Sequence, residues 1–156
     1  MDKEPTGRIA VSATARSRAT AAVVFGLLKD GASWPHWSIF DAFELERPGG
    51  SDRLGVGAIR MFKTRVSKVR EEVVALTEDS LLSYVLLSGL PMKNYRADVA
   101  LEAMPDGSTL IHWRARFDAK VPGTGWFWKL MMTNVLGTIS RQLAVAAERA
   151  SVTAPR

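Results

Sequence analysis

The sequence contains no cysteine and only two histidines, and these absences exclude several kinds of chemistry. Without cysteine the chain forms no disulfide, has no nucleophilic thiol and offers no thiolate to a metal ion. His36 and His112 are the only imidazoles, so a histidine-based metal site is not expected either. We therefore expect neither a bound metal nor another cofactor.

Long apolar runs and a strong charge bias are also missing. A bilayer-spanning helix needs roughly 18 consecutive apolar residues, and the nearest candidate, 126–136, is interrupted by Lys129, Thr133 and Asn134. Residues 1–5 carry charges of both signs and no apolar core, which is unlike a secretory signal. With a mildly basic net charge of +5, we expect a soluble, cytoplasmic protein without an integral membrane segment.

What the sequence does contain is the composition of a folded domain. Its 156 residues are 47% hydrophobic and 24% charged, close to the globular average, which excludes a disordered or collagen-like chain. The length fits one domain, and we expect residues 1–156 to form it. Five tryptophans against two tyrosines are the unusual feature of the composition.

The first third of the chain predicts one strand and two short helices. Apolar residues alternate with small or polar ones over 8–14, which is typical of a half-buried strand. Apolar residues then recur at helical spacing over 17–30, with Ser17 as the expected N-cap and Asp30-Gly31 as the end. The Pro-containing segment 34–37 predicts a single helical turn or a loop.

The remainder predicts six strands and a long helix. Turn residues bound the strands, and Asp106-Gly107 between two alternating runs is the strongest hairpin signal. The connections are too short for crossover helices, so the sheet should be antiparallel. A helix with an apolar stripe is expected from Gly125 to about Ala150, followed by a frayed tail over 151–156. The predicted strands are 42–46, 57–63, 67–76, 81–88, 95–104 and 109–120.

These elements predict an α+β fold in which a curved, seven-stranded antiparallel sheet surrounds the long C-terminal helix, with two short N-terminal helices. The order of these elements and several short sequence segments resemble the helix-grip fold of the START-like (SRPBCC) superfamily, specifically its polyketide cyclase/dehydrase branch. The resemblance covers residues 7–150 and implies a START-like ligand-binding domain with a cavity between sheet and helix that holds a hydrophobic small molecule. The matching segments are 34–37, 55–60, 82–84, 89–91, 95–98, 106–113 and 122–125.

Strand alternation suggests which side chains face such a cavity. Thr109, Ile111, Trp113, Ala115 and Phe117 share one apolar face of the last strand, which places His112 on the outer face. Aromatic residues on the inner face form either a ligand wall or plain core, and buried tyrosine hydroxyls bind either a ligand or a backbone carbonyl. The resemblance and the alternation together give these candidate ligand-binding residues: Trp34, Trp37, Tyr84, Tyr95, Val99, Trp113, Phe117, Trp128, Met132, Val135 and Ile139.

Four side chains are candidates for catalysis: His36, Arg60, Tyr84 and Tyr95. No spacing rule joins any two of them into a catalytic pair. Arg60 shares a strand face with Ala58 and Phe62, and the pattern leaves open whether that face is buried or solvated. If it is buried, the guanidinium needs a carboxylate partner or an anionic ligand group.

Two surface features keep other partners open. Basic residues cluster around one hairpin over 60–70, but they alternate with apolar residues and no nucleic-acid-binding motif accompanies them, so we expect a solvated hairpin and no nucleic-acid partner. Trp126, Phe127 and Trp128 point in three directions around a helix, so at least one should be exposed.

The sequence therefore leaves three hypotheses. The first is a protein that binds a lipid, isoprenoid or polyketide-like molecule. The second is a polyketide cyclase or dehydratase-type enzyme, which requires polar groups that face the cavity. The third is a protein-interaction or chaperone-accessory module with a filled interior and an exposed apolar patch around Trp126, through which a homodimer would form.

Overall fold

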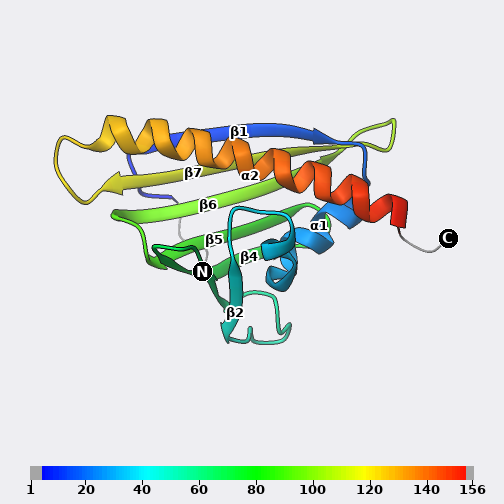
Figure 1. Ribbon diagram of the computed structural model, residues 1–156, viewed down its shortest axis with the longest axis horizontal. Helices are drawn as coiled ribbons and strands as arrows, with labels where there is room; N and C mark the ends of the chain where they lie inside the picture. Colours follow the sequence, from blue (N-terminus) through cyan, green and yellow to red (C-terminus); the bar gives the residue numbers. More distant parts are fainter. Residues whose placement is uncertain (1–4, 154–156) are drawn as a thin grey trace.

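The computed structural model describes residues 5–153 and shows an antiparallel sheet with a long helix across one face (Figure 1). Two short helical segments, α1 (Ala21–Lys29) and the 3-10 helix η1 (Gly31–His36), follow the first strand, and α2 (Gly125–Thr153) follows the last. The predicted α+β fold with seven antiparallel strands and a long C-terminal helix is confirmed. The strands are β1 (Ile9–Ser17), β2 (Ala42–Arg47), β3 (Ile59–Lys63), β4 (Lys68–Thr77), β5 (Leu81–Ser88), β6 (Met92–Ala103) and β7 (Thr109–Ala119).

The strands lie in the order β1-β7-β6-β5-β4-β3-β2, so consecutive hairpins build the sheet from β2 to β7 and β1 then pairs with β7. The β1 and β7 strands run along α2, whereas β2 runs across that direction (Figure 1). This strong twist leaves one face of the sheet wrapped toward α2. The α1–η1 segment connects the two edge strands and packs against α2, β5 and β6 through α1 and against β2 through η1.

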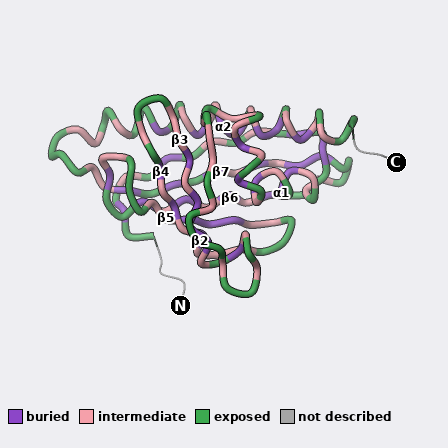
Figure 2. The backbone as a smooth tube through the Cα atoms, turned by 60° about the horizontal axis from the view of Figure 1, so that its bottom comes forward, coloured by how far each residue is buried: buried purple, intermediate pink, exposed green. Residues whose placement is uncertain are grey.

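The core lies between the sheet and α2. The predicted inner face of β7 is confirmed, because Thr109, Ile111, Trp113, Ala115 and Phe117 are all buried. His112 lies on the opposite face, where its Nε2 is 3.1 Å from the Glu102 carboxylate. Buried segments alternate with partly exposed ones along the strands (Figure 2). None of the described helices is long and apolar enough to cross a membrane.

Three predicted boundaries were wrong, each for a local reason. Ser17 ends β1 instead of capping α1, because its hydroxyl donates to the Ala144 carbonyl of α2 (2.8 Å) and the residue pairs with Thr109; Thr20 is the N-cap of α1. The β6 strand begins at Met92, three residues earlier than expected, because a register shift between Lys93 and Arg96 interrupts the alternation.

The third boundary is the end of α2, which continues to Thr153 where a frayed tail was expected from residue 151. No glycine or proline lies between Gly137 and Pro155, so nothing stops the helix at residue 150. Residues 154–156 of the expected tail, like residues 1–4 of the N-terminal segment, lie outside the described residues.

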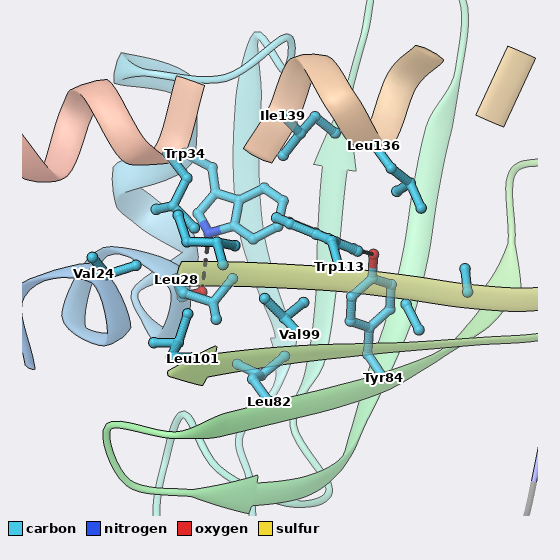
Figure 3. Packing of buried hydrophobic residues seen from close by; sticks show 14 of the residues in the cluster. Val24, Leu28, Trp34, Leu82, Tyr84, Val99, Leu101, Trp113, Leu136 and Ile139 are labelled. Atoms are coloured by element: carbon cyan, nitrogen blue, oxygen red, sulfur yellow. Dashed lines mark hydrogen bonds between the residues drawn. The ribbon is translucent and has the colours of Figure 1, made fainter. Parts of the chain in front are cut away.

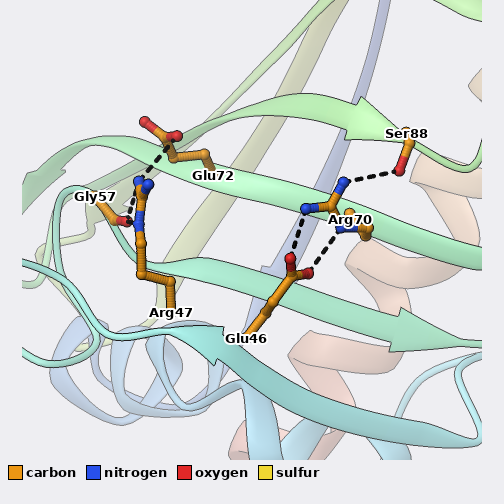
Figure 4. A network of polar contacts seen from close by, with 6 residues as sticks. All are labelled: Glu46, Arg47, Gly57, Arg70, Glu72 and Ser88. Carbon is orange, nitrogen blue, oxygen red and sulfur yellow. Dashed lines mark hydrogen bonds and ion pairs between the residues drawn. The ribbon is translucent and has the colours of Figure 1, made fainter.

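Ion pairs connect strands on the outer surface of the sheet. Arg70 of β4 donates to both carboxylate oxygens of Glu46 in β2, at 2.7 and 2.6 Å (Figure 4). Arg47 donates to the Gly57 carbonyl and to Glu72 in the same figure. The basic residues of 60–70 are thus not all free cations, since Arg70 is neutralised by Glu46 and Arg60 by Glu71.

Candidate functional site

A cavity of about 400 Å³ lies between α2, η1 and strands β4 to β6, and the β3–β4 hairpin forms part of its rim. Most of its wall is aliphatic or aromatic. Ile39, Val66 and Met131 line it and are also exposed to solvent, so they mark its mouth. The lining residues are Trp34, Ile39, Phe40, Thr64, Val66, Ser67, Val69, Glu71, Tyr84, Leu86, Leu90, Tyr95, Trp128, Met131, Met132, Val135, Leu136 and Ile139.

A buried ion pair stands at the polar part of this wall. Arg60 of β3 is 0% exposed and Glu71 of β4 is 4% exposed, and the two are direct partners in the β3–β4 register. Arg60 Nε donates to Glu71 Oε1 at 3.0 Å, and Nη2 donates to the same oxygen. Glu71 lines the cavity, whereas Arg60 lies behind it. The structure thus settles the open question about Arg60, whose strand face is buried.

The end of α1 and a set of aromatic rings hold the guanidinium in place. Arg60 Nη1 donates to the Leu28 carbonyl at 3.1 Å, and the indole N–H of Trp34 donates to the same oxygen at 3.1 Å. This carbonyl lies in the last turn of α1, where backbone oxygens lack helical partners and a cation is favoured. The guanidinium carbon also lies 5.0 Å from the Trp34 ring, 5.1 Å from Phe62 and 5.9 Å from Tyr84.

Tyr84 of β5 and Tyr95 of β6 complete the polar wall. Their rings lie 6.3 Å apart, and Tyr95 also stacks on Phe117 at 5.9 Å. The Tyr84 hydroxyl accepts a hydrogen bond from the Trp113 indole at 3.3 Å (Figure 3). Burial, reinforced by the negative charge of Glu71, raises the pKa of both phenols, so both remain protonated hydrogen-bond donors at neutral pH.

Burial also raises the pKa of the Glu71 carboxyl above its ordinary value, while the positive charge and hydrogen bonds of Arg60 act in the opposite direction. The carboxyl, its cation and two phenols are thus gathered in a water-poor wall. Such a group can hold the polar end of a bound molecule or take part in proton transfer.

The structure brings seven of the predicted ligand-binding residues to the cavity: Trp34, Tyr84, Tyr95, Trp128, Met132, Val135 and Ile139. The other four do not line it. Val99, Trp113 and Phe117 are fully buried and form the packing layer behind the tyrosines (Val99 and Trp113 in Figure 3). Trp37 packs on Trp34, with ring centroids 5.0 Å apart, and donates to Ser33.

Among the predicted catalytic candidates, Tyr84 and Tyr95 line the cavity, Arg60 is held behind Glu71, and His36 is exposed on η1 away from the cavity. Sequence reasoning missed Glu71. Its signal was available: Val69, Glu71 and Val73 share one face of β4, and both valines are buried. The adjacent charges in Arg70-Glu71-Glu72 concealed this alternation. No group of three or more acidic or histidine side chains that would hold a metal occurs within residues 5–153.

An exposed apolar patch covers the beginning of α2. Trp126 is 72% exposed, and Phe127, Leu130 and Met131 are exposed beside it. The expectation that one aromatic residue of 126–128 reaches solvent is confirmed. The same hypothesis required a filled interior, and the cavity of about 400 Å³ argues against that requirement.

The sequence itself now identifies the family. Residues 8–150 match the family described as "Polyketide cyclase / dehydrase and lipid transport". The chain belongs to this family. The resemblance to the polyketide cyclase/dehydrase branch drawn from the sequence segments is thereby confirmed, and the solved structures below share the START-like fold. No curated protein is significantly similar to the chain.

Solved structures share the fold at low sequence identity. A START superfamily protein from Mycobacterium smegmatis aligns with a TM-score of 0.78 and 16% identity, over 90% of this chain and 97% of its own. A solution structure from Thermobifida fusca aligns with a TM-score of 0.72 and 23% identity, over 95% and 97%. The protein XoxI from Bacillus cereus aligns with a TM-score of 0.72 and 14% identity, over 88% and 94%. These similarities establish the fold of the chain.

Proposed function

We propose that this chain is a binding protein for a hydrophobic small molecule, such as a lipid, isoprenoid or polyketide-like compound, held in the cavity between α2 and the sheet. The observation that carries the proposal is the cavity of about 400 Å³ with its largely apolar wall. Small-molecule sites in proteins typically combine such a wall with a few convergent polar groups, and here these are Glu71, Tyr84 and Tyr95. The family to which the chain belongs includes lipid transport in its description.

The mouth supports the same proposal. Ile39, Val66 and Met131 are apolar and exposed where they border the cavity. Exposed apolar side chains around an opening favour entry of an apolar molecule, because the molecule is partly removed from water before it is enclosed. The flexible side chains of Met131 and Met132 suit a wall that adapts to its ligand.

Binding of the neutral fluorophore Nile red tests the proposal, with a variant that fills the cavity. Val135→Trp places a large ring on the α2 side of the cavity wall. Val145→Trp makes the same substitution on the same helix at an exposed position that does not line the cavity, and serves as the control. Circular dichroism checks that both variants are folded. We expect saturable binding by the wild-type protein and the control, and at least tenfold weaker binding by Val135→Trp.

If Nile red does not bind to the wild-type protein, or if folded Val135→Trp binds it as well as the control does, the cavity is not a binding site. Native mass spectrometry of the purified protein supplies a second measurement, because a retained apolar ligand would appear as a discrete mass increase that Val135→Trp lacks.

A second candidate function, a cyclase or dehydratase-type enzyme, is favoured by one observation: the Glu71 carboxyl and two phenols face the cavity together. A carboxylate in an apolar site can remove a proton from a bound substrate, and a phenol can donate one to a developing oxyanion. Arg60 occupies one oxygen of Glu71 with two hydrogen bonds, so binding without chemistry is the primary proposal. Turnover of a bound polyketide that is lost in Glu71→Gln while binding persists would support the enzyme.

A further inference from the structure

The cavity wall contains a single formal charge. Among the described lining residues, Glu71 alone has a carboxyl or basic group, and it forms an ion pair with Arg60, whereas the tyrosines beside it are neutral donors. The two hydroxyl groups at the mouth are already engaged: Thr64 Oγ1 donates to the Ser67 carbonyl in the same turn, and Ser67 Oγ donates to the Gly89 carbonyl in the turn between β5 and β6. The polar chemistry that a ligand meets inside the cavity is therefore that of Glu71 and the two phenols.

The two oxygens of Glu71 are not equivalent. Both hydrogen bonds from Arg60 reach Oε1. Oε2 accepts no hydrogen bond from any residue in the described part of the chain, and it is not one of the fully enclosed unpartnered side-chain atoms, which are Ser140 Oγ and Gln142 Oε1, so it keeps some accessible surface. A carboxylate can accept bonds at both oxygens. The free acceptor thus belongs to a side chain that lines the cavity and is only 4% exposed.

The positive partner is not available to a ligand in the same way. Arg60 is 0% exposed and does not line the cavity. Within the described part of the chain its side chain makes three hydrogen bonds, two to Glu71 Oε1 and one to the Leu28 carbonyl, and aromatic rings lie against its guanidinium. A ligand in the cavity can therefore contact Glu71 directly, whereas Glu71 separates it from Arg60.

Resting on the proposed binding function, we propose that the ligand is a neutral, mostly apolar molecule whose polar group donates a hydrogen bond to Glu71 Oε2, such as a hydroxyl or an amide N–H. The Tyr84 and Tyr95 phenols are hydrogen-bonded to each other, which leaves one hydroxyl hydrogen to donate to an acceptor on the same group. A carboxylate or other anion in this position would stand against Glu71 in a medium of low dielectric constant and is disfavoured.

A series of ligands with equal chains tests this proposal on the wild-type protein. The probes are decanol, which donates and accepts; its methyl ether, which only accepts; and decanoate, which is anionic at neutral pH. Their affinities are measured by displacement of Nile red. Because hydrogen bonds to a charged group are the strong ones, we expect decanol to bind about tenfold more tightly than either competitor.

A preference for decanol above about threefold over both competitors supports the proposal, and a smaller difference, or tighter binding of the ether or of decanoate, overturns it. This outcome is distinct from failure of the proposed function, in which Nile red itself would not bind. The wild-type series stands even if the variant below fails to fold.

The Glu71→Gln variant changes the same atoms with little change in shape. It removes the negative charge and leaves the Arg60 charge without compensation. We expect the preference to reverse, so that decanoate binds at least as tightly as decanol. A matched control is Glu72→Gln, on the next residue of β4, which pairs with Arg47 outside the cavity and should retain the wild-type preference. If folded Glu71→Gln retains that preference, Glu71 does not select the ligand.

Discussion

The Arg60–Glu71 pair allows a specific test, because removing one partner leaves an uncompensated buried negative charge and removing the other leaves an uncompensated buried positive charge. Both side chains are buried. Breaking a buried pair by removing one member typically costs about 3–5 kcal/mol, since the other charge stays buried without compensation. In Arg60→Met the remaining group is a carboxylate, and in Glu71→Gln it is a guanidinium that keeps its bond to Leu28 and its ring contacts.

The two single variants should therefore differ in their dependence on pH. In Arg60→Met nothing opposes the effect of burial, so the pKa of Glu71 in the folded state rises further above its unfolded value. A raised folded pKa means that stability is fully retained below the unfolded pKa, near 4.5, and is lost as pH rises through the folded pKa. The loss approaches about 1.4 kcal/mol per pH unit within that window.

In Glu71→Gln no group titrates and the amide oxygen still accepts from Arg60. Its loss of stability should lie at or below the lower end of about 3–5 kcal/mol and should change little with pH. The double variant Arg60→Met/Glu71→Leu replaces the pair with apolar groups and should recover to within about 1 kcal/mol of the wild-type protein or exceed it.

Urea denaturation followed by tryptophan fluorescence between about pH 5 and pH 8 measures these differences. The reasoning is refuted if Arg60→Met loses less than about 1 kcal/mol at neutral pH or if its loss does not depend on pH. It is equally refuted if the double variant is less stable than both single variants.

Three further predictions concern packing, backbone and surface charge. Leu136 lines the cavity, whereas Leu143 is fully buried away from it, and replacing either with Ala should lower the free energy of unfolding by about 2–5 kcal/mol. Only Leu136→Ala should also strengthen the binding of ligands longer than decanol. Equal ligand affinities in the two variants would contradict the assignment of Leu136 to the cavity wall. At Gly89, where φ is +108°, an added Cβ would lie 2.1 Å from the Lys68 carbonyl oxygen. At Gly107, where φ is +86°, an added Cβ would meet no atom within 4 Å, so Gly107→Ala should cost only about 1–2 kcal/mol of stability. Thermal melting should therefore show a larger loss of stability for Gly89→Ala than for Gly107→Ala. Four surface carboxyl groups have a lowered pKa because each accepts a hydrogen bond: Glu46 from Arg70, Asp52 from Lys29, Asp106 from Ser108 and Asp118 from Asn94. A pKa that is lowered in the folded state gives stability that is lost as pH falls, so the urea midpoint should drop between about pH 5 and pH 3. An unchanged midpoint would show that these surface contacts contribute nothing to stability.

Much of the fold could be predicted because the alternation of apolar and polar residues along a long strand indicates both that the segment is a strand and which of its faces is buried. In β7 every second residue from Thr109 to Phe117 is apolar or small and is buried, so the inner face follows from the pattern alone. The end of α1 at Asp30-Gly31 and the Asp106-Gly107 hairpin follow from turn chemistry. Boundaries failed where side chains from distant elements intervened, as when the Ala144 carbonyl bonds to Ser17.

The site was less predictable because its residues come from several helices and strands, and the hydrophobic periodicity of each element does not determine how the elements are placed relative to one another. Sequence reasoning identified both tyrosines, but it counted Trp113 and Phe117 as wall although a layer of other side chains separates them from the cavity. It also left Arg60 undecided and overlooked Glu71. The two belong together only through the register of β3 and β4, which places them directly opposite each other. Leu90 and Val66 reach the cavity from turns, where no periodic signal exists.

The central claim, that an apolar ligand enters the cavity and not merely a surface patch, is tested most directly by the five tryptophan indole N–H signals in an NMR titration with decanol. Trp34 and Trp128 line the cavity, while Trp126 is 72% exposed on the apolar patch of α2. We predict saturable shifts of the Trp34 and Trp128 signals and an unchanged Trp126 signal. A shift confined to Trp126, or no shift of Trp34 and Trp128 at saturating decanol, would contradict the account.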